Sequence, residues 1–387
     1  MNRSLILAAH SDKPMKVEHE ADLPEDVRLL AHALQSSESR MNLSHAGTAS
    51  RFLTAHLATT TSKPVILDGS PRLRERPMAP LIDALRELGA EIHCLRKEGF
   101  LPIEIRPMDH VGGRVRIRGD VSSQFISALL LAAPSMKPGL DLEVDGELVS
   151  QPYIRMTLSV LEQAGVSFTE LDGMFGIGAQ PIKRQQGVME LDWSAATFCY
   201  SWVALGMLDE VLLPGLNMDS VQGDKVCAEI FQGLGVETHI EAGGIRLVKK
   251  QQESSSLDLD LNDYPDLAQG LIFTCAALGI PCHLKGLSTL PEKETDRLSA
   301  MKEVLGQVGL KASIGDAHIS IPSNDGLELR SNLPFRSYGD HRMAMSIALL
   351  CQSLDGMVMD HPDVVEKSFP TYWKEAIKAG IHIRPTN

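Results

Sequence analysis

Cationic residues gather in three short stretches of this chain, at residues 72–76 (RLRER), 293–297 (KETDR) and 366–370 (EKSFP). Guanidinium and ammonium groups placed together bind phosphates and carboxylates, and arginine does so bidentately. The same residues on a surface ordinarily form solvated ion pairs that contribute little. Each stretch alone therefore supports two interpretations, an anion-binding site or an ion-pair face.

Small and polar residues open four apolar segments, at residues 46–51 (AGTASR), 121–125 (VSSQF), 263–266 (DYPD) and 338–342 (YGDHR). A helix N-terminus carries free N–H groups and a partial positive charge, so small residues there let an anion approach. A single serine or aspartate is more often an ordinary helix cap. Because several such openings recur along the chain, the pattern favours a shared anion site.

Other chemistries lack their sequence signatures. The chain has no G-x-x-x-x-G-K-[ST], no G-x-G-x-x-G after a strand, and no H-x-x-x-H or H-E-x-x-H. His341 follows Asp340, but no serine or cysteine occupies a nucleophile elbow. Glu294 is either an ion-pair partner of Arg297 or a general acid/base. These absences disfavour a P-loop nucleotide site, a dinucleotide-binding fold, a metal site and a hydrolase triad.

The composition restricts the partners. The 387 residues contain 50 acidic and 37 basic side chains, for a net charge of −13, which argues against nucleic acid and anionic membranes as partners. The length suggests two or three domains. The six cysteines form no C-x-x-C pair, and we expect them to be free and buried in a reducing compartment. The apolar stretch near Met1 is too short for a leader sequence, so we expect a cytoplasmic protein.

A repeat of about 73 residues runs along the chain. A helical segment that ends in glycine recurs five times, with spacings of 76, 70, 74 and 71 residues between the glycines at 89, 165, 235, 309 and 380. A more apolar helical segment recurs at spacings of 75, 73, 71 and 75, beginning near residues 48, 123, 196, 267 and 342. Each repeat is predicted to run strand, apolar helix, strand, glycine-capped helix and two paired strands. Residues 2–9 and 24–34 would be the helices of a truncated first repeat, for six in all.

Nine stretches, in this order, resemble the 5-enolpyruvylshikimate-3-phosphate synthases of the enolpyruvyl transferase family. They are NRSLILAA, AGTASRFLTA, PRLRERPMAPLIDALRELGA, SSQFISALLLAAP, SQPYIRMTL, YPDLAQ, KETDRLSAM, GDHRMAMSIA and EKSFPTYW, and they extend from residue 2 to residue 373. The resemblance implies an α/β fold of two domains, each with three βαβαββ units. The domains are expected at 1–190 and 191–387, with the first strand missing.

The resemblance also implies a reaction and its partners. The enolpyruvyl group of phosphoenolpyruvate would move to the 5-hydroxyl of shikimate 3-phosphate with release of phosphate, as in aromatic amino-acid biosynthesis by the shikimate pathway. This addition and elimination would need no cofactor and no metal. The partners would be these two small anions, with neither nucleic acid nor membrane, and the chain is expected to be a monomer.

Site residues follow from the resemblance. Shikimate 3-phosphate is expected at Arg3, Ser122, Ser123, Gln124, Ser150, Tyr153, Asp266 and Lys293. Phosphoenolpyruvate is expected at Gly47, Arg76, Gln124, Arg297, Arg342 and Lys367. The catalytic residues would be Asp266, Glu294 and Lys293, with Glu294 moving the proton at the methylene carbon and Asp266 accepting the hydroxyl proton.

Three departures from the family pattern keep alternatives open. The family's Lys-Ser pair would fall before Met1, and its absence is expected to weaken the activity of this form. His45 and Thr289 stand where the family often has asparagine. A non-catalytic homologue that binds shikimate 3-phosphate is therefore an alternative. UDP-N-acetylglucosamine enolpyruvyl transferase is disfavoured, because no cysteine shortly precedes Arg76-Pro77.

Overall fold

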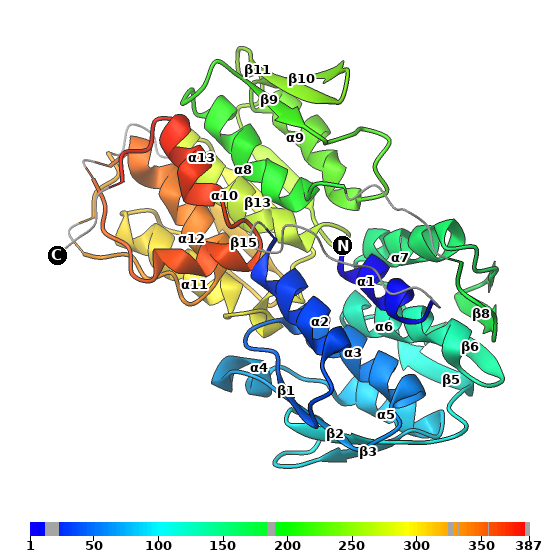
Figure 1. The fold of residues 1–387 in the computed structure, drawn as a ribbon. Coiled ribbons are helices and arrows are strands. Elements are labelled where there is room, and N and C mark those ends of the chain that lie inside the picture. The colour runs from blue at the N-terminus through cyan, green and yellow to red at the C-terminus, as the bar shows by residue number, and fades with distance from the viewer. Residues whose placement is uncertain (12–22, 184–189, 324–327, 332, 355, 384–387) are drawn as a thin grey trace. The chain divides into compact units, whose positions relative to one another are not determined.

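The computed structural model describes residues 1–11, 23–183, 190–323, 328–331, 333–354 and 356–383. The chain divides into two compact units, which we call unit 1 (Met1–Met189) and unit 2 (Glu190–Asn387) (Figure 1). Each unit has its own hydrophobic core. Over the described part of the chain, every helix is too short or too polar to span a bilayer.

One complete repeat occupies residues 40–106 of unit 1. Its elements are β1 (Arg40–Asn42), α3 (Gly47–Thr60), β2 (Val65–Asp68), α5 (Ala79–Glu87), β3 (Glu91–Cys94) and β4 (Ile103–Arg106), with the short helix α4 (Pro71–Glu75) before α5. Strands β1 and β2 are parallel, β4 is antiparallel to both β2 and β3, and the sheet order is β1-β2-β4-β3. The helices connect the strands, so the parallel pair is closed by a helical crossover.

Two further repeats have the same strand order. In unit 1 the elements are β5 (Gly113–Arg118), α6 (Ser123–Ala132), η2 (Ala133–Ser135), β6 (Gly139–Asp145), α7 (Gln151–Gln163), β7 (Thr169–Leu171) and β8 (Met174–Gly178), with order β5-β6-β8-β7. In unit 2 they are β12 (Leu257–Asp260), η4 (Pro265–Leu267), α10 (Ala268–Leu278), β13 (Cys282–Lys285), η5 (Leu290–Glu292), α11 (Arg297–Gln307), β14 (Ser313–Ile314) and β15 (His318–Ile321), with order β12-β13-β15-β14. These three repeats confirm the βαβαββ pattern.

The remaining segments supply parts of the same plan. Unit 1 begins with α1 (Asn2–Ala9) and α2 (Glu25–Gln35). Unit 2 contains α8 (Trp193–Ala204), β9 (Glu210–Pro214), η3 (Gly223–Val226), α9 (Cys227–Gly233), β10 (Val236–Glu241) and β11 (Gly244–Lys249), with strand order β10-β11-β9. It ends with α12 (His341–Ala348), η6 (Leu349–Gln352), η7 (Pro362–Lys367) and α13 (Tyr372–Lys378).

The periodic glycines end helices as predicted. All five have positive φ, from +78° to +98°, at Gly89, Gly165, Gly235, Gly309 and Gly380. Only glycine adopts this left-handed conformation without a Cβ penalty. The repeat length read from the sequence is therefore a repeat of helix ends in the structure.

The apolar helices lie inside each unit. In unit 1, α3 packs against α6 and α2; in unit 2, α10 packs against α8 and α12 (Figure 1). Most of the side chains of α3, α6, α8, α10 and α12 are buried. Helix α5 instead buries one face and exposes Asp83. The N-termini of the buried helices are thus fixed by packing on nearly every side.

The cationic stretch 293–297 contains a helix start. Lys293 and Glu294 follow η5, and α11 begins at Arg297 with Asp296 as its cap. The Asp296 carboxylate accepts the amide of Ser299, which places the helix start there. All six cysteines are free as expected, but Cys94 and Cys351 are half-buried rather than buried.

Candidate active site

Arg297 is the centre of a buried charge cluster in unit 2. Its side chain is 2% exposed, and its Nε donates to Asp340 Oδ2 at 2.7 Å. Its Nη2 donates to Glu294 Oε2 at 2.9 Å, and its Nη1 to Asp266 Oδ1 at 3.1 Å. Three carboxylates from separate segments therefore meet at one guanidinium, whose N–H groups donate hydrogen bonds to all three.

Asp266 connects this centre to two more cations. Its Oδ1 lies 3.5 Å from Lys293 Nζ, and its Oδ2 lies 3.4 Å from Arg342 Nη2. Burial alone would raise the pKa of Asp266, but the charges of Lys293, Arg342 and Arg297 outweigh it and hold that pKa well below its usual range. Asp266 is therefore ionised in the unliganded protein at neutral pH.

Asp340 organises the arginines on two helices. It is fully buried and caps α12 by accepting the amide of Arg342 at 2.8 Å. The same carboxylate holds Arg297, at the start of α11. Burial opposes its charge, but Arg297 lowers the pKa of Asp340. Sequence reasoning did not assign Asp340 to the site, although its position directly before an apolar helix marks it as a cap.

Lys367 pairs with Glu294 from the far end of unit 2. Its ammonium donates to Glu294 Oε1, and both side chains are about nine-tenths buried. Lys367 ends η7, and the following helix α13 is fixed by Tyr372, whose hydroxyl donates to the Met345 carbonyl of α12 at 2.9 Å. The position of Lys367 thus depends on residues packed around α12.

His341 lies in the same cluster as a neutral side chain. It is 5% exposed, and its Nδ1 has no hydrogen-bond partner among the described residues. Burial, with the charge of Lys367, lowers the pKa of His341 to about 3. The charged groups of the cluster are therefore four cations, Lys293, Arg297, Arg342 and Lys367, and three carboxylates, Asp266, Glu294 and Asp340.

In unit 1, Arg76 lies over the first residue of α3. A Cβ added to Gly47 would stand 2.9 Å from Arg76 Cζ and 3.0 Å from Arg51 Nη1. Arg51 donates to the carbonyls of Gly47 and Pro77, at 3.0 and 3.3 Å. Both arginines are buried. A side chain at this position would have to displace the guanidinium groups of Arg76 and Arg51.

The start of α6 supplies hydroxyl and amide groups. Ser122 caps the helix by accepting the amide of Gln124, and Ser123 is buried at the first helical position. Gln124 Nε2 donates to the hydroxyl of Thr48, on α3, at 3.1 Å. The sequence analysis did not single out Thr48. This hydrogen bond connects the N-terminus of α6 to that of α3, and each of these is the first helix of its repeat.

Arg3 lies against α7. Its Nε donates to the Thr157 hydroxyl at 2.7 Å, and its Nη2 to the Tyr153 carbonyl at 3.0 Å. Burial lowers the pKa of Arg3 to about 10, so it stays charged at neutral pH. Ser150, the N-cap of α7, is buried and has positive φ. Helices α1, α6 and α7, which carry residues predicted to bind one ligand, thus pack against one another within unit 1.

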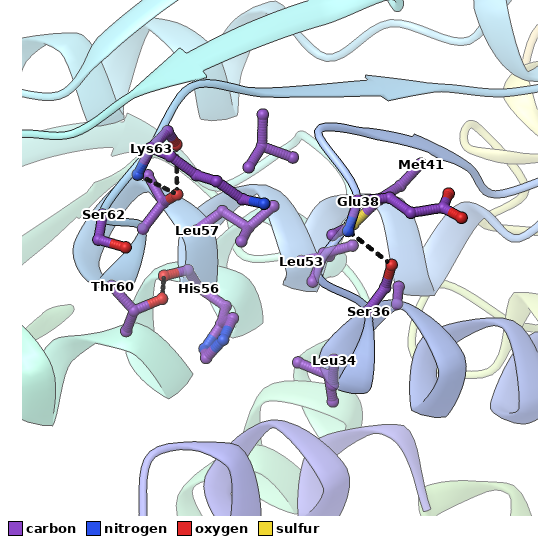
Figure 2. Close-up of a pocket in the computed structure, with 13 residues that line it drawn as sticks. Leu34, Ser36, Glu38, Met41, Leu53, His56, Leu57, Thr60, Ser62 and Lys63 are labelled. Atoms are coloured by element: carbon purple, nitrogen blue, oxygen red, sulfur yellow. Dashed lines mark hydrogen bonds between the residues drawn. The ribbon is translucent and has the colours of Figure 1, made fainter.

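A separate pocket of about 170 Å³ lies in unit 1 beside α2, α3 and β2. Figure 2 shows Leu53, His56 and Leu57 of α3 around it, with Lys63 and Glu38 at its edge. The Lys63 ammonium donates to the carbonyl of Ser37. None of the residues predicted for the site lines this pocket, so we do not assign the chemistry to it.

Comparison of the sequence with known proteins identifies relatives of this chain. The sequence model of the family EPSP synthase (3-phosphoshikimate 1-carboxyvinyltransferase) matches residues 13–376. A 3-phosphoshikimate 1-carboxyvinyltransferase of Bacteroides fragilis is 39% identical over 386 residues, which cover 99% of this chain and 93% of that protein. One from Shewanella pealeana is 36% identical over 352 residues, covering 89% and 80%.

Solved structures give the same fold. EPSP synthase of Acinetobacter baumannii superposes with a TM-score of 0.71 at 19% identity, over 98% of this chain and 93% of that one. The enolpyruvyl transferase NikO of Streptomyces tendae gives 0.68 at 15% identity, over 99% and 93%. The predicted two-domain α/β fold is thereby confirmed. With a family match over most of its length, the chain belongs to the EPSP synthase (3-phosphoshikimate 1-carboxyvinyltransferase) family.

Proposed function

We propose that this chain transfers the enolpyruvyl group of phosphoenolpyruvate to the 5-hydroxyl of shikimate 3-phosphate and releases phosphate, in aromatic amino-acid biosynthesis. Membership of the family supports the reaction. The observation that carries it here is the buried Arg297 cluster, because it combines four cations with two carboxylates that can exchange protons.

The cations would bind the phosphate and carboxylate of phosphoenolpyruvate. Arg297, Arg342 and Lys367 are each at least nine-tenths buried, so a bound anion would be shielded from water. In the unliganded chain they pair with Asp266 and Glu294. Gly47 and Arg76 of unit 1 are assigned to the same substrate.

Shikimate 3-phosphate is assigned to the hydroxyls, amides and cation of unit 1. These are Arg3, Ser122, Ser123, Gln124, Ser150 and Tyr153, with Asp266 and Lys293 of unit 2 at its hydroxyls. The N-terminus of α6 and its two serines suit a phosphate, since free N–H groups and hydroxyls donate to its oxygens.

The reaction would proceed by addition and then elimination. The 5-oxygen forms a bond to C2 of phosphoenolpyruvate as its proton passes to Asp266, and a proton is delivered to C3 at Glu294. In the elimination, Glu294 removes a proton from C3 and the bond from C2 to the phosphate oxygen breaks. Glu294 thus regains the proton that it gave to C3, and the leaving phosphate takes the electron pair of the broken bond together with the hydroxyl proton held by Asp266.

Substrate binding would also prepare Asp266 as a base. Its pKa is low because three cations face it. When substrate anions compensate Lys293, Arg342 and Arg297, their pull on Asp266 weakens and its pKa rises. A carboxylate with a higher pKa accepts a hydroxyl proton more readily. The free protein would thus hold a weak base that strengthens when both substrates are present.

We also propose that units 1 and 2 are the two domains of the family fold, each with three repeats. The division between Met189 and Glu190 supports this. A monomeric state and a cytoplasmic location remain predictions. Light scattering on the purified chain measures the first, and fractionation of cells that express it tests the second.

The test of the reaction is phosphate release that requires both substrates. We expect the purified chain to release phosphate with phosphoenolpyruvate and shikimate 3-phosphate together, and mass spectrometry to detect the enolpyruvyl ether. Glu294→Gln and Asp266→Asn should each reduce turnover at least about a hundredfold, as expected for loss of a general acid or base. Phosphate release from phosphoenolpyruvate alone, or no ether product, would contradict the proposal.

A further inference from the structure

The arginine-rich stretch 72–76 contains one residue assigned to substrate, Arg76, and two arginines that the reaction leaves unexplained. The five residues Pro71–Glu75 form α4, which ends at Arg76. A helix this short is not stable by itself, because nucleation costs more than so few hydrogen bonds return. Contacts outside α4 must therefore hold it, and with it the backbone of Arg76.

Besides the Ser70 cap and the buried Leu73, Asp68, the last residue of β2, supplies charged contacts to α4. Its Oδ1 accepts Arg74 Nε at 2.7 Å, and its Oδ2 accepts Arg74 Nη2 at 2.9 Å, which makes a bidentate pair. Its Oδ2 also accepts Arg40 Nη2, from β1, at 2.7 Å. The amide of Gly69 donates to Oδ1. One carboxylate thus fastens the end of β2, the start of β1 and the helix α4.

The side chains of Asp68, Arg74 and Arg40 are buried to different extents. The Asp68 side chain is 5% exposed, Arg74 is 30% exposed and Arg40 is 60% exposed. Burial opposes the charge of Asp68, but hydrogen bonds from Arg74 and Arg40 outweigh it and lower its pKa to about 2. The bidentate partner on α4 is the better ordered of the two, since it is less exposed and bound through two nitrogens.

The other end of the segment is also constrained. The amide of Arg76 donates to the Leu73 carbonyl of α4, and Met78 donates to the Gly99 carbonyl. The guanidinium of Arg76 lies over Gly47, where an added Cβ would displace it. A shift of α4 would therefore move Arg76 relative to α3, and a misplacement of about 1 Å is enough to lower activity strongly.

We propose that Asp68 is a positioning residue for phosphoenolpyruvate: through its bidentate pair with Arg74 it fixes α4 and so holds Arg76 against Gly47. This inference rests on the proposed function, which assigns Arg76 to that substrate. It gives Arg74 a role in the site without contact to substrate. Arg40 is the supporting, solvent-exposed partner.

The test compares Michaelis constants for the two substrates. Asp68→Asn keeps the size of the side chain and removes its charge; we expect the KM for phosphoenolpyruvate to rise about tenfold, with kcat and the KM for shikimate 3-phosphate changed less than about twofold. Arg74→Met leaves Asp68 paired with Arg40, so the fold is retained, and should give nearly the same selective rise. The double variant should be no worse than either single variant, because both remove one interaction.

Arg72→Met is the matched control. It removes one arginine from the same helix, where Arg72 pairs with the exposed Glu75 at 3.2 Å, and both KM values should stay within about twofold of the starting protein. An inactive starting protein would overturn the proposed function. An active one in which Asp68→Asn and Arg74→Met leave the KM for phosphoenolpyruvate unchanged, or change both KM values and kcat together, would overturn the positioning role alone.

Discussion

In unit 2 the helices at the charge cluster begin at carboxylates, whereas in unit 1 the corresponding helices begin at small or hydroxyl residues. Asp296 and Asp340 cap α11 and α12, and Asp192 caps α8. The N-caps of α3, α6 and α7 are Ala46, Ser122 and Ser150, and their first turns contain no acidic residue. The capping residues at these helix starts therefore differ in charge: they are carboxylates in unit 2 and neutral residues in unit 1.

The difference follows from the charges that each unit must hold. Unit 2 buries several full positive charges, and burial of an unpaired cation is costly, so carboxylates keep the cluster together before substrate arrives. At the starts of α6 and α7, unit 1 instead offers partial positive charges, which need no permanent counter-ion and can be satisfied by the anion of a ligand. In the proposed mechanism the carboxylates of unit 2 also supply proton-transfer groups, which unit 1 lacks among its assigned residues.

Breaking the centre of unit 2 should have the largest effect. Arg297→Met would leave Asp340 and Asp266 without their shared partner, so we expect turnover to fall below detection. The free energy of unfolding should fall by about 3–5 kcal/mol, the usual cost of leaving a buried charge unpaired. Urea unfolding and phosphate release measure the two effects.

Arg246→Met is the control for that experiment. Arg246 pairs with Glu241 and Glu210 on the three-stranded sheet, where its side chain is 31% exposed. We expect a loss of no more than about 1 kcal/mol and normal turnover. Equal effects of the two substitutions would contradict the special role of the buried cluster.

A carboxylate cap at the start of α6 in unit 1, like the carboxylate caps of unit 2, should weaken the binding of an anion there. Ser122→Asp keeps a good cap for α6, so stability should be retained. The added charge should raise the KM for shikimate 3-phosphate about a hundredfold, because a phosphate would meet a carboxylate at the helix start. Ser122→Asn, a neutral cap of nearly the same size, should change that KM far less. Similar KM values for the two variants would show that the phosphate binds elsewhere.

Adding a methyl group at Gly47 should test the close approach in unit 1. Gly47→Ala would press a Cβ against the guanidinium groups of Arg76 and Arg51. We expect the KM for phosphoenolpyruvate to rise about tenfold or more, through displacement of Arg76. The control is Gly306→Ala on α11, where nothing lies within 4 Å of an added Cβ. That variant should be as active as the starting protein and slightly more stable.

The last effect is on stability alone and concerns two histidines of unit 1, the buried His56 and the half-buried His10. His56 Nδ1 lies 3.1 Å from His10 Nε2, and His10 Nδ1 lies 2.6 Å from the Ser135 hydroxyl. Burial lowers the pKa of His10 to about 4; burial and then His10 lower that of His56 to about 3. As the pH falls below about 6.5, these histidines bind protons in the unfolded chain but remain neutral in the folded chain. The free energy of unfolding therefore falls.

Urea unfolding at pH 7, 6 and 5 measures this dependence. Each buried histidine should contribute a loss of up to about 1.4 kcal/mol per pH unit below 6.5, until the folded pKa is reached. His56→Gln should reduce the slope, whereas His239→Gln, at an exposed position on β10, should leave it unchanged. An unchanged slope for His56→Gln would contradict the assignment.

Local patterns made the repeat predictable. Gly89, Gly165, Gly235, Gly309 and Gly380 mark helix ends because only glycine adopts positive φ freely, and each has that conformation. The sequence also showed which helices are buried, since their residues are apolar on every side. Strand order within a repeat was not predictable from residue types, because it depends on which distant edges pair.

The candidate site was likewise predictable in part from the sequence and decided in part by the tertiary structure. The residue types by themselves indicated an anion site at the polar helix starts, but they left an ion-pair face open for the stretches that contain Arg297 and Lys367. Only the resemblance to the family assigned Arg297, Arg342 and Lys367 to a small anionic ligand. The tertiary structure decided which charges meet. Asp340, Glu294 and Asp266 converge on Arg297 only because α10, α11 and α12 pack in one core, and Asp68 reaches Arg74 only because β2 ends beside α4. Charge is a property of a residue, whereas pairing is a property of distance, and distance across the chain is fixed by packing.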